Sequence, residues 1–567
     1  MSERLLARLE EAKRRRPGAG ETARLLRAAR RADLRDSEGV IRLHDTVLFL
    51  RAYPHSRRVL SLCEEILSTF ARRVARLAHS RADLSAFDHP EVSGIAGTAI
   101  TTDYSFDVVT WLKRRFGRRV SADWETHEAA DRLRALWPRF LPLLEEEALE
   151  DANVRYLDYL RAGRRRGEDD LSWLLERIGA LPLSPTEKAE RFEAQEIPVR
   201  WDLGDTGHTR TRMRRRVSRP FFHDAPLVKH GVSIESELAS PRLPVERLSR
   251  PEGRAVLEMT REATALRYRE YYGFTYGDPS SVLRAQAGRG LEIYLLGLER
   301  DRRLPLRAGF AGFFVKNSVP VGYIEALAFF ERVEVGFNVY YAFREGESAW
   351  IFARVVKLLH QVLGVTSFSM DPYQLGHENE EAIRSGAFWF YRKLGFRSTD
   401  TRLRELTSRE EARLVSNSSY RTPPRTLRRL AKHNLLYEVP SNTKSKPKNR
   451  KSDWDRFHVR NLSLAVVRRM AKDFGGNADE IRSFSESSVA RVLGVNPRRW
   501  DTRERRAFAD LALVLGLIPD FPRWPRGDRQ AVLRIIRAKT GRGEKSYLRL
   551  LRRHARLRSA ILALGSS

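Results

Sequence analysis

The sequence contains one cysteine and thirteen histidines in 567 residues. A single cysteine excludes a disulfide framework, a zinc site built from several cysteines and an iron-sulfur cluster. Cys63 stands at helical spacing in LSLCEEIL, where we expect a small buried hydrophobic side chain. Because His208, His223 and His230 match no metal-ligand spacing, the sequence predicts no metal site.

Long apolar runs are also absent. No segment approaches the about 20 apolar residues of a membrane-spanning helix, and the first residues, MSERLLARLEEAKRRR, lack the apolar stretch of a signal peptide. We therefore expect a cytoplasmic protein without a transmembrane segment. Hydrophobic residues make up 42% and charged residues 31% of the chain, which favours a globular protein. Since single cores rarely exceed ~250 to 300 residues, the length predicts about three domains.

Positive charge exceeds negative charge, with 104 Lys and Arg against 73 Asp and Glu and a net charge of +31. Residues 441–567 carry 30 of the basic and 12 of the acidic side chains. This excess of about +18 would attract nucleic acid, ribosomes, an anionic membrane surface or an acidic protein. A solvated arginine-rich surface is the alternative interpretation.

The composition changes several times along the chain. Apolar residues at helical spacing, as in VLSLCEEILSTFARRVARL, predict a helical N-terminal domain over residues 1–197. Residues 198–250, with several prolines and an arginine-rich run, are predicted to form an irregular basic linker or wrapping segment. The low-complexity stretch NTKSKPKNRKSD predicts a basic linker at 439–455, and a basic helical domain is expected at 456–567.

Residues 251–438 alternate between strand-like and helical patterns. A helix is predicted at about Glu252 to Tyr272, followed by four strand-like runs: EIYLLGLE, LRAGFAGFFVKN, VGYIEALAFF and VEVGFNVYYAF. Asn317 to Pro320 predicts a tight turn, and hence an antiparallel hairpin between the second and third runs. A helix closed by Gly364 is predicted next, then a short strand, a second helix and a last strand from Phe396.

The element order of residues 305–400, with SGAFWFYRKLGFR at its end, resembles the C-terminal half of the GNAT N-acyltransferases. The family signature, an Ala followed by Tyr-x-Lys-x-Gly-Phe, corresponds to Ala387, Tyr391, Lys393, Gly395 and Phe396. The resemblance implies a GNAT-like domain that transfers an acyl group from acetyl-CoA or another acyl-CoA to an amine of an unknown acceptor. The expected fold class is α+β multidomain: a helical N-terminal region, a central GNAT-like mixed sheet with flanking helices, and the basic helical C-terminal domain.

The resemblance also implies where the cofactor binds. In the family, a strand splays from its neighbour and binds pantetheine, and the next loop holds the diphosphate with backbone N–H groups. The corresponding residues are Val339, Tyr341, Phe343, Arg344, Gly346, Ser348, Ala349 and Asn379. A helix start suits an anion because its first N–H groups lack partners. Glu347 stands where the family's loop has a glycine, so it must point outward for a diphosphate to bind.

Direct attack of an amine on a thioester needs a base for the ammonium proton and an acid for the departing thiolate. The resemblance implies Tyr391 as the acid, and core packing is the alternative role for this aromatic side chain. Glu334 is a candidate base, because it alternates with Gly336 away from the apolar face of its strand. Glu325 on the preceding strand and His377 in the following loop are the other two candidates.

The competing hypothesis is a non-catalytic, nucleic-acid-associated protein that uses the GNAT-like domain as a scaffold. SSVARVLGVNPRRW resembles the turn of a helix-turn-helix motif, a pattern that ordinary helix hairpins share. The last segment, SYLRLLRRHARLRSAILAL, has a leucine stripe that suits packing on the domain, or binding to RNA or an anionic surface. Stabilisation by acetyl-CoA would favour the enzyme, and binding to polyanions alone would favour the scaffold.

Overall fold

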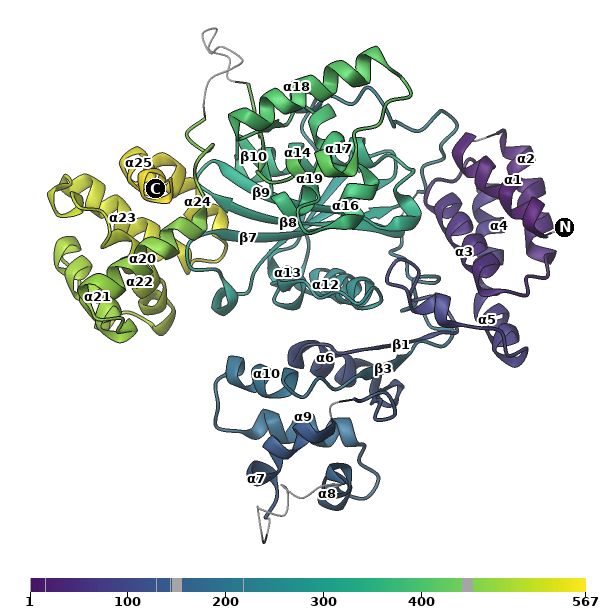
Figure 1. Ribbon diagram of the computed structural model, residues 1–567, viewed down its shortest axis with the longest axis horizontal. Coiled ribbons are helices and arrows are strands. Elements are labelled where there is room, and N and C mark those ends of the chain that lie inside the picture. The colour runs from purple at the N-terminus through teal and green to yellow at the C-terminus, as the bar shows by residue number, and fades with distance from the viewer. Residues whose placement is uncertain are drawn as a thin grey trace.

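The computed structural model describes residues 2–15, 17–128, 130–142, 144, 155–217, 219–440 and 452–566. They form an α+β protein in which a large mixed β-sheet is flanked by helices. Figure 1 shows the sheet at the centre, an N-terminal group of helices at one end and the C-terminal helices at the other. Most of the predicted linker at 439–455 lies outside the described residues.

The described residues of the central region form a nine-stranded sheet with the order β11-β12-β10-β9-β8-β7-β6-β5-β4. The strands are β4 (Val245–Arg247), β5 (Leu283–Gly288), β6 (Leu291–Gly297), β7 (Ala308–Lys316), β8 (Val319–Phe329), β9 (Arg332–Val339), β10 (Ser367–Met370), β11 (Arg397–Ser398) and β12 (Leu435–Glu438). Neighbouring strands are antiparallel except β9 and β10, which are parallel.

The hairpin between β7 and β8 confirms the turn predicted from the sequence. The two strands are antiparallel, and both Asn317 and Ser318 have positive φ, at 44° and 78°. Positive φ at both central residues matches the twist of the flanking strands. Every residue of β7 is buried, which explains its continuous apolar run, AGFAGFFVK.

The other predictions for the central region need corrections. The fourth run ends at Val339, because Tyr341–Phe343 forms a 3₁₀ helix, η7, instead of continuing the strand. The predicted helix at Glu252 to Tyr272 ends early: α12 (Arg250–Ala265) gives way to a turn in which Tyr268 has a φ of 55°. The sequence analysis also did not find β4, β5 and β12; β12 lies between β10 and β11.

Helices cover both faces of the sheet (Figure 1). One face carries α14 (Ser348–Leu363), α16 (Glu380–Ser385), α17 (Ala387–Lys393), α18 (Thr401–Ser416) and α19 (Pro424–Leu430), with the short α15 (Pro372–Leu375) leading from β10 to α16. The opposite face carries α12 and α13 (Tyr272–Thr275). α14 connects β9 to β10, as parallel neighbours require a helical crossover.

The N-terminal helices are α1 (Ser2–Arg15), α2 (Ala19–Arg31), α3 (Ser37–Ala52), α4 (Arg57–Leu67), α5 (Phe70–His79) and η1 (Ser85–Asp88). Cys63 is a free, buried side chain, as predicted, and burial raises the pKa of its thiol. α3 packs against η7, so this group reaches the loop that precedes α14.

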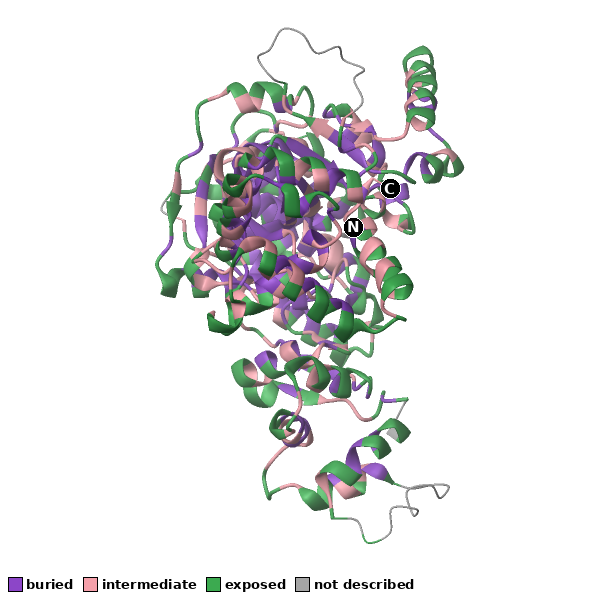
Figure 2. Cartoon of the chain, turned by 90° about the vertical axis from the view of Figure 1, so that its left-hand side faces the viewer, coloured by how far each residue is buried: buried purple, intermediate pink, exposed green. Residues whose placement is uncertain are grey.

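A second lobe follows, which Figure 2 shows as a less buried part of the molecule. It contains β1 (Ala99–Thr102), α6 (Phe106–Phe116), η2 (Gly117–Arg119), β2 (Val120–Ala122), η3 (Ala130–Leu136), α7 (Trp137–Phe140), α8 (Tyr156–Gly163), α9 (Asp170–Ala180), α10 (Pro185–Glu193) and β3 (Val199–Asp202). Its strands form an antiparallel sheet of order β1-β3-β2, which the helical pattern of the sequence did not predict. α11 (Ile234–Ala239) leads on to the central sheet.

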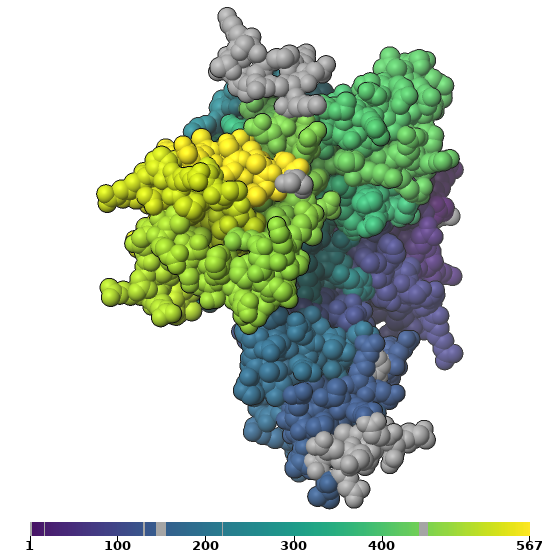
Figure 3. Space-filling view, turned by 60° about the vertical axis from the view of Figure 1, so that its left-hand side comes forward, coloured from purple at the N-terminus to yellow at the C-terminus, as the bar shows by residue number. Residues whose placement is uncertain are grey.

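The C-terminal helices dock on the central sheet. They are α20 (Val459–Asp473), α21 (Ala478–Leu493), η8 (Pro497–Arg499), α22 (Thr502–Leu515), η9 (Phe521–Arg523), α23 (Arg526–Lys539), α24 (Glu544–Arg553) and α25 (Ala555–Gly565). Figure 3 shows them against the central region. Buried Glu544 accepts hydrogen bonds from Lys539 Nζ at 2.5 Å and from the Gly309 amide at 3.1 Å, and Arg558 pairs with Glu331. No described helix has the length and apolarity needed to cross a bilayer.

Gly253 fixes how closely α12 approaches the loop that follows α13. A Cβ atom at this position would overlap the carbonyl oxygen of Pro279. Gly253→Ala is therefore expected to lower the free energy of unfolding by about 1 to 3 kcal/mol, although alanine is the better helix former. Gly179 in α9 is the matched control, because a Cβ there meets nothing within 4 Å.

Gly179→Ala should instead raise the free energy of unfolding by up to about 1 kcal/mol. Urea denaturation followed by circular dichroism measures both variants. Equal and favourable effects of the two substitutions would contradict the close approach of α12 to Pro279.

Candidate active site

β9 and β10 separate after a short parallel pairing. Their register covers three residue pairs, from Arg332 with Ser367 to Glu334 with Ser369. β9 then continues along β8 as far as Val339, whereas β10 ends at Met370. The side chain of Gln374 from α15 reaches the exposed edge of β9 and accepts a hydrogen bond from the Phe337 amide at 3.3 Å. A gap therefore opens in the sheet.

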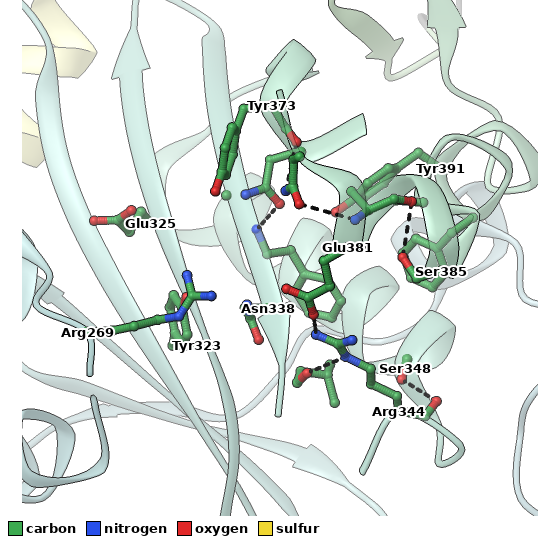
Figure 4. Close-up of a pocket in the computed structure, with 18 of the residues that line it drawn as sticks. Arg269, Tyr323, Glu325, Asn338, Arg344, Ser348, Tyr373, Glu381, Ser385 and Tyr391 are labelled. Carbon is green, nitrogen blue, oxygen red and sulfur yellow. Dashed lines mark hydrogen bonds and ion pairs between the residues drawn. The ribbon is translucent and has the colours of Figure 1, made fainter. Parts of the chain in front are cut away.

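A cavity of about 410 Å³ occupies this gap (Figure 4). Its walls come from β8, β9, α14 to α17 and the segment before α13. The lining residues are Arg269, Tyr271, Tyr323, Glu325, Gly336, Phe337, Asn338, Val339, Arg344, Ser348, Tyr373, Gln374, Asn379, Glu381, Ala382, Ser385, Ala387, Phe390 and Tyr391.

The pairing of β8 with β9 determines which lining residues face α13. Tyr323 stands opposite Asn338, and Glu325 opposite Gly336. Directly paired residues project from the same face of a sheet. Tyr323 packs edge-on against Phe274 of α13, with ring centroids 6.1 Å apart, so this face is the α13 side.

The alternate residues of β9 face α14. Phe337 packs against Phe352 of α14, with ring centroids 5.0 Å apart, and Val339 projects in the same direction. The cavity is therefore lined by residues from both faces of the sheet at the gap, where the Gln374 side chain also lies. Figure 4 shows Glu325 on one side of β9 and Tyr391 on the other.

Tyr391 is held in place by an aromatic cluster on the α14 side. Its ring lies 5.4 Å from that of Phe352 and 5.0 Å from that of Phe390. The side chain is 3% exposed, and burial raises the pKa of its hydroxyl. Tyr391 therefore both packs in the core, the alternative role considered from sequence, and lines the cavity with a protonated hydroxyl.

Glu325 is a half-buried carboxyl on the α13 side. Burial raises its pKa, and within the described part of the chain it has neither an ion pair nor a hydrogen bond. A carboxylate held in a cavity without a partner is an unfavourable arrangement that suits a proton acceptor. Nearby, the hydroxyl groups of Tyr271 and Tyr323 contact each other.

Glu347 points away from the cavity. Its side chain is fully buried and accepts hydrogen bonds from Lys316 Nζ at 2.6 Å, Arg289 Nε at 2.8 Å and the Val228 amide at 3.1 Å. Burial alone would raise its pKa, but these donors, Lys316 above all, hold the pKa below its ordinary value. Glu347 is therefore not the outward side chain that the sequence analysis required, but a buried salt-bridge partner of Lys316 outside the lining of the cavity.

The loop before α14 is held by the N-terminal helices. The Glu347 amide donates to Tyr53 Oη at 3.4 Å, and a Cβ at Gly346 would lie 2.5 Å from that oxygen. Gly346 is thus needed for the packing of Tyr53. Ser348 and Ala349 are the first residues of α14, where amides have no intrahelical partner.

The polar residues at the α14 end of the cavity form hydrogen bonds or ion pairs with other protein groups. Arg344 pairs with Glu381 of α16 and donates from Nε to the Val339 carbonyl at 3.2 Å. Ser348 Oγ donates to the Arg344 carbonyl at 3.2 Å. Asn379 caps α16 by accepting from the Ala382 amide at 3.2 Å.

Six of the residues predicted from sequence lie together around the cavity: Glu325, Val339, Arg344, Ser348, Asn379 and Tyr391. The other six are outside its lining. Glu334 pairs with Arg307 at 3.2 Å and lines a separate cavity of about 190 Å³ with Asp371 and His458. His377 and Tyr341 are exposed, and Phe343 is buried, as η7 replaces the predicted end of the strand.

Gly346 and Ala349 complete that second group. The lining residues that sequence reasoning missed include Arg269, Tyr271 and Tyr323. Arg269 and Tyr271 fall in RYREYYGF, which was assigned to the end of a helix, although its crowding of aromatic and basic side chains was a usable signal.

A second arrangement of catalytic type is inaccessible. His44 contacts Asp45 Oδ1 through Nδ1 at 2.9 Å and Thr211 Oγ1 through Nε2 at 3.0 Å. His44 and Thr211 are fully buried, and Thr211 Oγ1 already accepts from the Ala96 amide. Burial lowers the pKa of His44, which suits a neutral structural histidine.

No family model, curated protein or solved structure matches this chain. Among the described residues, no group of three or more His, Cys, Asp or Glu side chains is placed to hold a metal ion. The chemistry of the site must therefore be inferred from its own side chains.

The role of Glu347 can be tested against that of its neighbour Glu345. Glu347→Ala leaves Lys316 buried without its carboxylate, so the free energy of unfolding should fall by about 3 to 5 kcal/mol. Glu345 is 47% exposed and pairs with Lys13 at 3.1 Å, so Glu345→Ala should lower it by at most about 1 kcal/mol. Urea denaturation gives both values, and similar losses for the two variants would refute a structural role specific to Glu347.

Proposed function

We propose that the protein is an acyl-CoA-dependent N-acyltransferase whose active site is the cavity between β9 and β10. The observation that carries this proposal is that residues from both faces of the sheet line one cavity at the gap. A thioester entering from the α14 side and an amine entering from the α13 side would meet at the gap. This arrangement supports the GNAT resemblance of residues 305–400 and its implied co-substrate.

The α14 side suits the CoA portion. Beyond Glu334, the edge of β9 that faces the gap has no pairing with β10. Its Phe337 amide and Val339 carbonyl are bonded to the side chains of Gln374 and Arg344, which pantetheine would replace. The start of α14 offers the free amides and positive dipole end that favour a diphosphate, with Ser348 in the cavity wall. Arg344 adds a guanidinium that would exchange Glu381 for a phosphate oxygen.

The chemistry follows from the two sides of the gap. Glu325 takes a proton from the ammonium group, and the neutral amine attacks the thioester carbonyl. As the C–N bond forms and the C–S bond breaks, the Tyr391 hydroxyl gives a proton to the CoA thiolate. The second proton released by the nitrogen restores the tyrosine through solvent. The raised pKa of Glu325 makes it a stronger base. The raised pKa of Tyr391 keeps its hydroxyl protonated and also makes it a weaker acid toward the thiolate.

Acetyl-CoA binding tests the proposal through Ser348. An aspartate at the first position of α14 is compatible with the helix dipole, but its charge would repel a diphosphate. Ser348→Asp should weaken acetyl-CoA binding by about 10- to 100-fold, whereas the isosteric, neutral Ser348→Asn should change it by less than about 3-fold. Isothermal titration calorimetry measures both.

Equal binding by the two variants would contradict a diphosphate site at α14. The same protein is titrated with mixed DNA and RNA at several salt concentrations. Polyanion binding without any stabilisation by acetyl-CoA would favour the non-catalytic scaffold, in which case the transferase proposal is wrong.

Replacement of Glu325 separates catalysis from folding. Glu325→Gln should lower kcat/KM by about 10²- to 10⁴-fold, while Glu334→Gln, on the next strand and outside the cavity, should leave it nearly unchanged. The kcat/KM of the unaltered protein should rise with pH through the raised pKa of Glu325, because only the carboxylate accepts a proton.

The same substitution, Glu325→Gln, should not lower the stability of the fold. A carboxyl whose folded-state pKa is raised destabilises the fold at neutral pH, so Glu325→Gln should retain or increase the melting temperature. Loss of activity together with a lower melting temperature would indicate a structural residue instead.

A further inference from the structure

Two opposite charges line the α13 side of the cavity without pairing. Arg269 and Glu325 both contribute to its wall. Arg269 forms a hydrogen bond with the Tyr271 hydroxyl and is attracted by Glu381 of α16, but neither Arg269 nor Glu325 lies within ion-pair distance of an oppositely charged side chain among the described residues. Opposite charges that share a cavity attract each other, so a fold that keeps them apart leaves each available to a ligand group of opposite sign.

The two charges share the α13 side of one cavity. Figure 4 shows the Arg269 guanidinium beside Tyr323, and Glu325 projects from the next position on the same face of β8. A small zwitterion, which carries an ammonium and a carboxylate on one carbon, is complementary to one cation and one anion in the same cavity.

The difference in burial between Glu325 and Arg269 determines how a zwitterion would be oriented in the cavity. Glu325 is half-buried and stands opposite Gly336, whose missing side chain leaves room beside the gap. Arg269 is the more exposed of the two residues. A zwitterion would therefore place its ammonium next to the gap and its carboxylate outward. The ring of Tyr323 adds an aromatic surface that attracts a cation.

We infer that the acceptor is an α-amino acid, with its ammonium group on Glu325 and its carboxylate on Arg269. This inference rests on the proposed function. The reaction converts the α-ammonium into an amide: a C–N bond forms, the thioester C–S bond breaks, one proton goes to solvent through Glu325 and one remains on the CoA thiol. The product has lost the positive charge that Glu325 binds, which favours its release.

The inference is tested with the full chain, acetyl-CoA and matched acceptors, by measuring free CoA thiol. The common amino acids are compared with their primary amides, which keep the amine but lack the carboxylate. Loss of the carboxylate should lower kcat/KM by about 10- to 100-fold, mainly through KM. Amides that react as well as the amino acids would overturn the inference and leave the transferase proposal standing.

Arg269→Gln provides the matched variant. It should lower kcat/KM for amino acids by about 10- to 100-fold and leave that for the amides unchanged. Arg409→Gln, at an exposed position on α18, should affect neither. If Arg269→Gln reduces both substrate classes alike, Arg269 does not bind the carboxylate and the inference is wrong.

Calorimetry with an amino acid alone distinguishes the two levels of the proposal. Amino acid binding that Arg269→Gln weakens, in a protein that does not bind acetyl-CoA, would refute the transferase and support the zwitterion site. Acetyl-CoA binding and thiol release with simple amines, but no binding of amino acids, would refute the zwitterion site alone.

Discussion

The candidate site depends on one constraint, the early end of the parallel pairing between β9 and β10. Only three residue pairs join the two strands, and β10 is held on its other edge by β12 over all four of its residues. β10 therefore cannot follow β9 past Met370 without breaking its ladder to β12. Packing of Phe337 against Phe352 on α14 fixes the free edge of β9 in turn. The gap is thus a stable feature of the sheet.

The same gap explains why an acidic residue can precede α14. The carboxylate of Glu347 lies beside the start of the helix, where the dipole favours negative charge, and it neutralises the buried ammonium of Lys316. Since Lys316 has no exposed surface, the salt bridge is required wherever this lysine is present. Glu347 therefore belongs to the packing between the hairpin end of β7 and α14, and Ser348 is the first residue of the helix that meets the cavity.

Local sequence patterns predicted individual helices and strands better than they predicted which strands pair with each other. The β7–β8 hairpin followed from Asn317 and Ser318, and the helix after β9 from its apolar spacing and Gly364, because turn chemistry and periodicity are local. β12 was missed since its four residues carry no periodicity of their own, and its place between β10 and β11 is set by long-range pairing.

The residues of the candidate site also fall into two groups: those that local sequence patterns predicted and those that only the tertiary structure shows. The residues near the signature, such as Tyr391 and Ser348, were found from sequence because one contiguous segment contains them. Arg269 and Tyr271 were not, since they reach the cavity only after α12 ends and the chain turns at Tyr268. Glu334 and Glu325 could not be ranked, because both face away from the most apolar side of adjacent strands. Only the register shows that Glu325 stands at the gap.

In the proposed transferase, the alternation of residues along β9 would account for the separation of the base from the acid. Gly336 and Phe337 are consecutive in β9, so they project to opposite faces of the sheet. In an ordinary sheet the two faces are sealed from each other by the ladder. At the gap, Glu325 from one face and Tyr391 from the other line the same cavity. In the proposed transferase, the base and the acid would therefore act from opposite sides of the reacting carbon and would not compete for one surface.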